Sequence, residues 1–104
     1  MGFIEDLKSM LGACSDEDFQ ARQRKVSYNL LKFLEDNELL SDTSKLSTET
    51  FSDDFELHGT DLTDEGFELY STGVQKWYQS FDRGQSADNI KLLEKYLKKI
   101  RNKK

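Results

Sequence analysis

Large hydrophobic residues recur at three- and four-residue steps between Thr63 and Gly84, the most regular pattern in the chain. This spacing places one apolar stripe along a helix of 3.6 residues per turn. The stripe consists of Phe67, Tyr70, Val74, Trp77, Tyr78 and Phe81. Thr63 is a favourable N-cap, and Gly84 is a favourable residue just after the last turn. The pattern predicts a core helix over residues 64–82.

Three further stretches have the same period and predict three further helices. The first covers residues 3–11, with apolar side chains at Phe3, Ile4, Leu7, Met10 and Leu11. The second covers residues 16–37, where Ser15 and Asp18 stand at the spacing of a capping box. The third covers residues 87–101 and follows a short turn. Because that turn is short, the last helix should run antiparallel to the core helix.

The apolar period changes to two between residues 53 and 62. Phe55 and Leu57 alternate there with Glu56 and His58, which is the pattern of a half-buried strand. A single short strand needs a partner. A small hairpin and an irregular extended segment packed on the core both stay open.

The complete pattern predicts one domain of the mainly α class over residues 1–104. It has four helices and a short extended segment or small hairpin around residues 53–62. The Ser- and Thr-rich residues 41–52 should form an exposed connection before it, because these side chains compete for backbone hydrogen bonds. A length of 104 residues suits one modest core, and the absence of proline leaves long helices unbroken.

Cysteine content and the N-terminal sequence bear on the compartment. Cys14 is the single cysteine, which excludes an intramolecular disulfide and a zinc site built from cysteines. The first residues lack the basic and apolar regions of a signal peptide, and no run approaches about 18 apolar residues. These features predict a soluble cytoplasmic protein with no membrane partner.

The formal net charge of −5 conceals a strong polarity along the chain. Residues 35–68 hold twelve acidic residues and one basic residue, Lys45. Residues 91–104 hold seven basic residues and one acidic residue, Glu94. Basic residues near a helix C-terminus are common because they offset the helix dipole. The acidic segment, residues 35–68, exceeds what helix capping needs and is the informative feature.

Candidate catalytic and metal-binding groups lie within the acidic segment. His58 could act as a general base with Glu56 or Asp61, but no nucleophile in a strained glycine turn accompanies it. Asp53 and Asp54 could join those carboxylates around a hard cation, but the spacing is not that of an EF-hand loop. The sequence therefore predicts no enzyme, no cofactor and no metal site.

A dense acidic surface favours rapid association with a basic protein, since opposite charges steer the encounter. The predicted contact residues are Asp53, Asp54, Glu56, Asp61, Asp64, Glu65 and Glu68. The pattern leaves the oligomeric state open.

Two resemblances bear on function. The run of residues 61–67, Asp-Leu-Thr-Asp-Glu-Gly-Phe, resembles the turn from a wing strand into the next helix of winged-helix regulators. That resemblance implies nucleic-acid binding as an alternative function. In that family a basic helix precedes the wing, whereas residues 41–54 are acidic and rich in Ser and Thr, which argues against nucleic acid as a partner.

The second resemblance covers the whole chain by type. Its length, its acidity and the block of Lys76-Trp77-Tyr78, residues 82–84 and residues 92–100 resemble small bacterial immunity proteins of polymorphic toxin systems, including contact-dependent growth inhibition. This resemblance implies a cytoplasmic antitoxin without catalytic residues. Its partner would be a cationic toxin domain, typically a nuclease, neutralised through an acidic surface.

Overall fold

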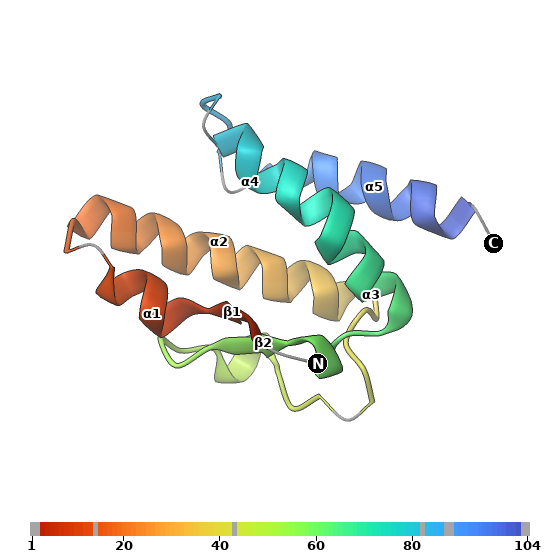
Figure 1. Cartoon of the computed structure of the whole chain (residues 1–104), viewed down its shortest axis with the longest axis horizontal. Helices are drawn as coiled ribbons and strands as arrows, with labels where there is room; N and C mark the ends of the chain where they lie inside the picture. Colours follow the sequence, from red (N-terminus) through yellow and green to blue (C-terminus); the bar gives the residue numbers. More distant parts are fainter. Residues whose placement is uncertain (1–2, 14, 43, 82, 87–88, 103–104) are drawn as a thin grey trace.

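The computed structural model describes residues 3–13, 15–42, 44–81, 83–86 and 89–102; Cys14 and Asp82 lie outside this part. The fold is mainly α, as predicted, with one short sheet (Figure 1). In chain order the elements are β1 (Phe3–Asp6), α1 (Leu7–Gly12), α2 (Glu17–Asp36), the 3-10 turn η1 (Thr48–Thr50), β2 (Glu56–His58), the 3-10 turn η2 (Gly59–Asp61), α3 (Asp64–Leu69), the π-helical turn η3 (Tyr70–Val74), α4 (Gln75–Phe81) and α5 (Lys91–Asn102).

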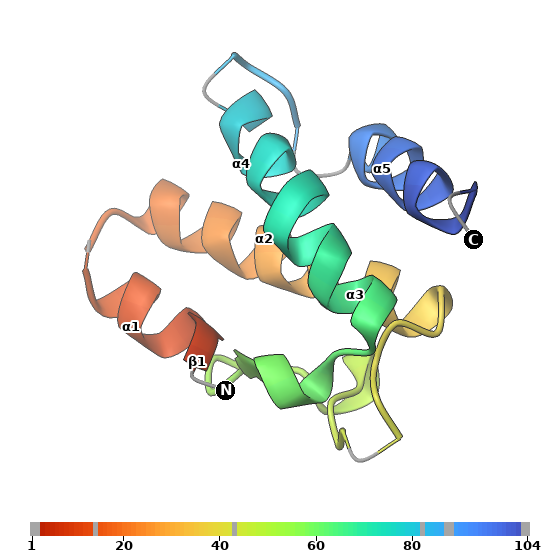
Figure 2. The same cartoon turned by 45° about the vertical axis from the view of Figure 1, so that its right-hand side comes forward.

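Helix α2 occupies the middle of the molecule. Helix α1 and the two strands lie on one side of it, and the α3–α4 rod with α5 lies on the other (Figures 1 and 2). Apolar side chains from all these layers form one core, because each helix buries its apolar face against α2 or against its neighbour. The fully buried members include Leu7, Leu30, Leu31, Leu34, Leu39, Leu57, Leu69, Val74, Trp77 and Leu93.

The predicted helix over residues 3–11 is wrong for its first half. Phe3–Asp6 is strand β1, which pairs antiparallel with β2, and the helix begins at Leu7. The backbone N–H of Leu7 continues the pairing by donating to the carbonyl of Phe55 at 3.1 Å. The short strand β2 requires a partner, and the N-terminal segment meets this requirement at the expense of one helical turn. The sheet is therefore not a local hairpin within residues 53–62.

The predicted helix over residues 16–37 is confirmed as α2, with a different cap. Asp16 is the N-cap, and its carboxylate accepts from the backbone N–H of Asp18 at 2.8 Å and of Phe19 at 3.3 Å. A carboxylate at this position also compensates the positive end of the helix dipole. The helix ends at Asn37, whose backbone N–H and side-chain amide both donate to the carbonyl of Phe33.

The predicted core helix over residues 64–82 forms as α3, η3 and α4 in one continuous rod. The hydroxyl of Thr63 accepts from the N–H of Gly66 at 3.1 Å, so the predicted cap is confirmed. Trp77 is completely buried, and its indole Nε1 donates to the carbonyl of Asn89 at 2.9 Å. This bond satisfies the one polar atom of the largest core side chain.

Phe67 was predicted to belong to the buried stripe, but its side chain is 39% exposed. The core face of the rod runs instead through Leu69 and Val74, which are five residues apart because the π-helical turn η3 adds a residue between them. Phe67 precedes Leu69 by two residues, or about 200° around a helix, and therefore points away from the core.

The predicted last helix begins at Lys91 rather than at residue 87. The backbone N–H of Asn89 donates to the carbonyl of Ser86, and the side-chain carbonyl of Asn89 accepts from the N–H of Lys91 at 3.2 Å. A turn thus precedes the helix, with Asn89 positioned to receive the indole of Trp77. Helix α5 returns antiparallel along α3 and α4, as predicted (Figure 1). Arg101 near its end therefore reaches Glu65 at the start of α3.

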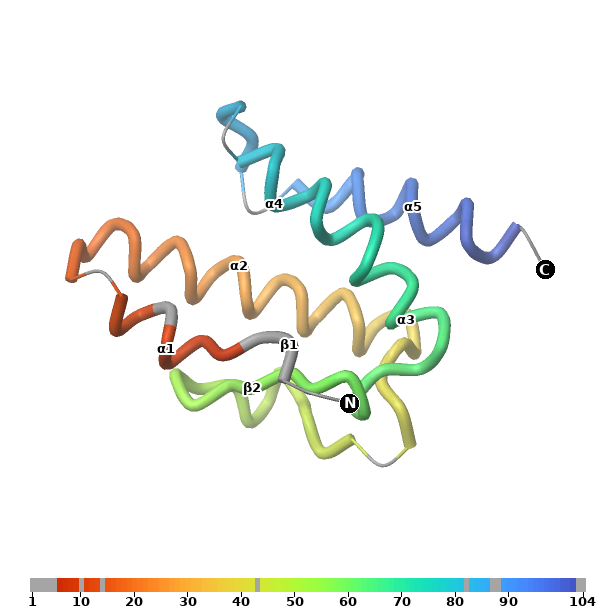
Figure 3. The backbone as a smooth tube through the Cα atoms, in the orientation of Figure 1, coloured from red at the N-terminus to blue at the C-terminus, as the bar shows by residue number. Residues whose placement is uncertain are grey.

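Residues 41–52 are exposed only in part. The tube in Figure 3 shows the chain leaving α2, passing below the sheet and returning to β2. Leu46 and Phe51 are half-buried against the core, and Phe51 lies edge-on to Tyr28 with ring centroids 5.4 Å apart. Two apolar side chains in a polar segment are enough to hold it against the fold.

Two glycines provide a matched test of close packing at the start of α3. A Cβ at Gly66 would lie 2.6 Å from the backbone carbonyl oxygen of Leu39, whereas one at Gly12 would meet nothing within 4 Å. We expect Gly66→Ala to lower the free energy of unfolding by about 2 kcal/mol, despite the better helix propensity of alanine. Gly12→Ala should change it by less than about 0.5 kcal/mol. Urea unfolding followed by circular dichroism measures both, and equal effects would contradict the close approach.

Candidate acidic binding surface

The seven predicted contact residues do not form one cluster. Asp54, Glu56 and Asp61 line a groove beside β2. Asp64 and Glu68 are exposed on α3. Asp53 and Glu65 are engaged by arginines from other helices. The structure therefore divides the acidic segment into open carboxylates and carboxylates with a structural partner.

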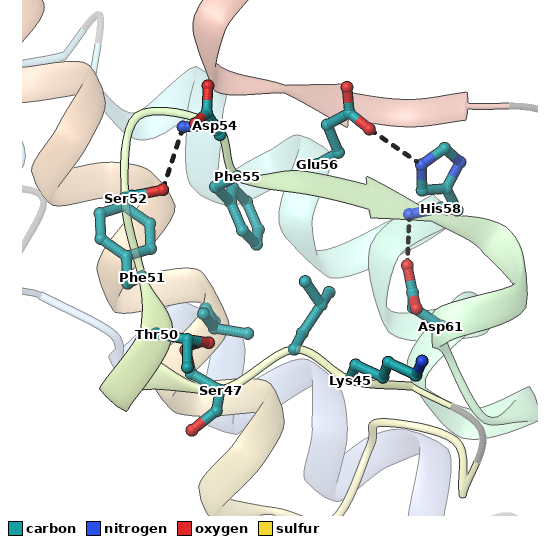
Figure 4. A pocket seen from close by; sticks show the side chains of 12 residues that line it. Lys45, Ser47, Thr50, Phe51, Ser52, Asp54, Phe55, Glu56, His58 and Asp61 are labelled. Atoms are coloured by element: carbon teal, nitrogen blue, oxygen red, sulfur yellow. Dashed lines mark hydrogen bonds and ion pairs between the residues drawn. The ribbon is translucent and has the colours of Figure 1, made fainter.

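The groove has a volume of about 420 Å³ and lies between β2 and residues 45–52. Its floor is apolar, with contributions from Leu31, Leu46, Phe51 and Phe55. Its walls are polar, and Figure 4 shows Asp54, Glu56, His58 and Asp61 along the side formed by β2 and η2, with Lys45 on the opposite side. Among the described residues that line the groove, Lys45 is the one lysine or arginine. The groove is thus an apolar channel with an acidic margin.

Asp61 and Glu56 hold the end of the groove in shape. One carboxylate oxygen of Asp61 accepts from the backbone N–H of His58 at 2.9 Å, which closes η2 (Figure 4). Glu56 lies 3.5 Å from Nε2 of His58, with both side chains about half exposed. A contact of this length between solvated groups is weak, so a stronger cation could displace it.

Asp53 is bound by Arg24 of α2 in a two-point contact, with Nε at 2.8 Å from one carboxylate oxygen and Nη2 at 3.0 Å from the other. Hydrogen bonding to this guanidinium lowers the pKa of Asp53 and raises the pKa of Arg24. The planar fork of arginine matches a carboxylate in this geometry. Asp53 therefore links the turn before β2 to α2, and its negative charge is already balanced by Arg24.

Asp54, the next residue, is differently placed. Its side chain is 83% exposed, and its contact with Nζ of Lys8 is long, at 3.9 Å. An exposed pair at this distance contributes little. Asp54 is consequently available at the entrance of the groove.

Helix α3 carries the second group of open acids. Asp64 and Glu68 are one turn apart on its surface, whereas Glu65 is 24% exposed and lies 3.8 Å from Nε of Arg101. The exposed ring of Phe67 stands between these acids in sequence. An exposed aromatic ring among charges is a common anchor at protein interfaces.

The sequence did not indicate Phe67 or the apolar floor of the groove as binding features. The stripe that contains Phe67 follows the helical period closely, so no sequence signal separates it from core. Phe51 and Leu46 are apolar residues in an otherwise polar segment, and this was the one feature of the sequence that hinted at the apolar floor.

The polar side chains around the groove bear on metal binding and on local hydrogen bonding. Groups of three or more His, Cys, Asp or Glu side chains arranged to hold a metal ion do not occur in the part of the chain that the structure describes. Two groove serines are used in turns, since Ser52 accepts from the N–H of Asp54 and Ser47 accepts from the N–H of Glu49.

Comparisons with protein-family models, curated proteins and solved structures give no match for this chain. Within the described residues, no helix has the length and apolar character required to cross a bilayer. The groove and the surface of α3 are therefore the features from which a function can be inferred.

The Asp53–Arg24 contact can be tested by its dependence on pH. Because the pKa of Asp53 is lowered in the folded state, its contribution to the free energy of unfolding is present above the unfolded pKa of about 4. It is lost as the pH falls through the lowered folded value. We expect Arg24→Met to reduce stability more at pH 7 than at about pH 2, measured by urea unfolding at each pH.

The control for this experiment is Arg24→Met in an Asp53→Asn background. There the effect of the arginine change should be equal at both pH values. A wild-type difference that does not shrink in acid would show that the contact contributes no charge-dependent stability.

Proposed function

We propose that this protein is an immunity protein that neutralises a cationic bacterial toxin domain by binding it through an acidic surface. The contact surface consists of the open acids Asp54, Glu56, Asp64 and Glu68, the groove acid Asp61, one of whose carboxylate oxygens already accepts from the N–H of His58, and Phe67. The observation that supports this most strongly is the combination of uncompensated carboxylates with apolar contact area on the same stretch of chain, from β2 to α3.

The division of the acids supports binding rather than simple solvation. Carboxylates needed for the fold have arginine or backbone partners, as at Asp53 and Asp61. Asp54, Asp64 and Glu68 remain exposed, and of these three only Asp64, in the first turn of α3, also offsets a helix dipole. Repulsion among them disfavours the compact state, whereas a cationic partner would benefit from it.

A nuclease is the kind of partner that this surface fits best. A protein that acts on nucleic acid needs a cationic surface to neutralise phosphates. An acidic protein bound to that surface would exclude the substrate and compete for the same lysines and arginines. Inhibition would therefore be stoichiometric and would need no chemical step.

The winged-helix alternative has less support. Between α2 and β2 the described residues contain only the 3-10 turn η1, so no helix stands where a recognition helix would precede a wing. The acids of residues 35–68 would also repel a phosphate backbone.

Removing three open carboxylates tests the proposed surface. We expect Asp54→Asn, Asp64→Asn and Glu68→Gln together to slow association with the cationic toxin domain, sought as a basic product of the adjacent reading frame, by about tenfold at low ionic strength. The difference should diminish as salt is added, because screening removes long-range attraction. Surface plasmon resonance over a series of salt concentrations measures both effects.

The matched control removes three exposed carboxylates elsewhere, at Glu17, Asp18 and Glu94. It raises the net charge by the same three units. Equal slowing by both triple variants would attribute steering to net charge alone, and no slowing by the first would contradict the proposed surface.

Phe67 should act after the encounter. We expect Phe67→Ala to raise the dissociation rate by about tenfold while the protein stays folded at the assay temperature, because the 39% exposed ring is open to a partner although the rest of its surface is covered by the fold. Ser71→Ala, one turn further along the same helix, should leave dissociation unaltered. A lower melting temperature with unchanged binding would instead assign Phe67 to the fold.

A further inference from the structure

We infer that the groove beside β2 receives an extended segment of the cationic partner, which adds to the sheet as a third, antiparallel strand. The segment places a lysine or arginine opposite Glu56, with an apolar residue on either side of it. This inference rests on the proposed function and specifies how its partner binds.

The pairing of the two strands determines which backbone groups of β2 face away from β1. The register places Glu5 opposite Leu57 and Asp6 opposite Glu56, and the N–H of Leu7 donates to the carbonyl of Phe55. In an antiparallel pair, residues that exchange hydrogen bonds alternate with residues that do not. The carbonyl of Phe55 and the backbone groups of Leu57 therefore face β1, whereas the backbone groups of Glu56 point away from β1.

The free edge of β2 faces the groove. Figure 4 shows β1 along one side of β2 and the groove on the other, bounded by the chain that carries Lys45 and Ser47. The N–H of His58 also points to this side and is occupied by Asp61. The N–H and the carbonyl of Glu56 have no hydrogen-bond partner among the described residues. A strand edge with an unpaired donor and acceptor is a template for another extended chain.

The groove offers matching contacts for the side chains of such a chain. Phe55 and Leu57 point to the buried face of the sheet, and Glu56 points to the exposed face. Because side chains directly opposite each other share a face, a residue opposite Glu56 lies beside its carboxylate, and its two neighbours point toward the apolar floor. Phe51 and Leu46 supply that floor.

Charge complementarity identifies the occupant as cationic. A basic side chain opposite Glu56 would also lie near Asp54 and Asp61, the other acids of the groove. A basic segment of the partner matches this margin, whereas an acidic or purely apolar segment would leave these carboxylates desolvated without a counter-charge.

A short peptide of the inferred pattern tests the groove without the partner. The probe is acetyl-Thr-Val-Arg-Val-Thr-amide, added up to about 2 mM to the isotopically labelled full chain and followed by NMR. We expect saturable shifts of the backbone amides of Glu56 and Leu46, with the Glu56 amide moving downfield as it gains an acceptor. Cross-strand contacts between the α protons of the peptide and β2 should accompany these shifts.

Backbone methylation separates strand addition from simple charge attraction. Methylating the arginine nitrogen removes the donor to the carbonyl of Glu56 and should weaken binding by about fivefold. Methylating the nitrogen of the following valine, which points away from β2, should have little effect. Glu56→Gln in the protein should weaken binding and reduce its salt dependence, while Glu17→Gln at the exposed start of α2 should not.

The isomeric peptide acetyl-Arg-Val-Val-Thr-Thr-amide has the same charge and composition without the alternation. Equal binding of both peptides, equal effects of both methylations or the absence of shifts at Glu56 would overturn strand addition. If the peptide fails while removal of Asp54, Asp64 and Glu68 still slows association with the basic protein, the proposed function stands without this mode of binding. If both experiments fail, both proposals fall.

Discussion

The junction between the end of α2 and the start of α3 fixes the geometry of everything that follows it. The carbonyl of Leu39 accepts from the backbone N–H of Thr63 at 2.9 Å and from its hydroxyl at 3.2 Å. Gly66 approaches the same carbonyl so closely that no side chain fits between them. One residue later, the bridge between Leu40 and Leu62 and the bond from the N–H of Ser41 to the carbonyl of Asp61 extend the contact. These bonds place η2 and α3, and hence their acids, at a fixed angle to α2.

That junction also explains how the fold tolerates its negative charge. The acids nearest to it have specific partners, with Asp61 on the N–H of His58 and Glu65 beside Arg101. Arg101 also donates to the carbonyl of Asn37 at 2.7 Å, so the basic end of α5 is tied to the end of α2. The cations of the C-terminal helix thereby compensate part of the acidic segment within the molecule. The acids left over are those at the groove and on α3.

Local chemistry in the sequence was sufficient for most of the helical fold. Thr63 predicted the start of α3 because capping depends on neighbouring residues alone. Residues 3–6 were mistaken for helix because their strand partner lies about fifty residues away in the sequence. The local spacing of apolar residues contains no information about a pairing at that distance. Phe67 was mistaken for core because the π-helical turn that shifts the stripe is set by packing of η3 against α5, where Tyr96 lies close to Gly73.

The groove was beyond sequence reasoning for a similar reason. Its walls come from segments on either side of Phe51, and their separation depends on how β2 is held by β1. The acids themselves were visible as a charge pattern, but which of them are free depends on where Arg24 and Arg101 lie in space. The acidic residues can therefore be counted from the sequence, whereas the structure is needed to show which of them are paired with an arginine.

The size of the groove limits what it can do by itself. A stable protein interface buries about 1,200–2,000 Å² of surface in total. One short strand bound in a groove of only about 420 Å³ would bury much less surface than that. A partner that binds tightly must therefore also contact the surface of α3, where Phe67 provides apolar area between Asp64 and Glu68. Only residues 59–63 separate β2 from α3, and within them Leu62 pairs with Leu40 and Thr63 is bonded to Leu39, so one partner can contact both sites at the same time. Carboxylates would then govern how fast the complex forms, and the apolar floor and Phe67 would govern how long it lasts.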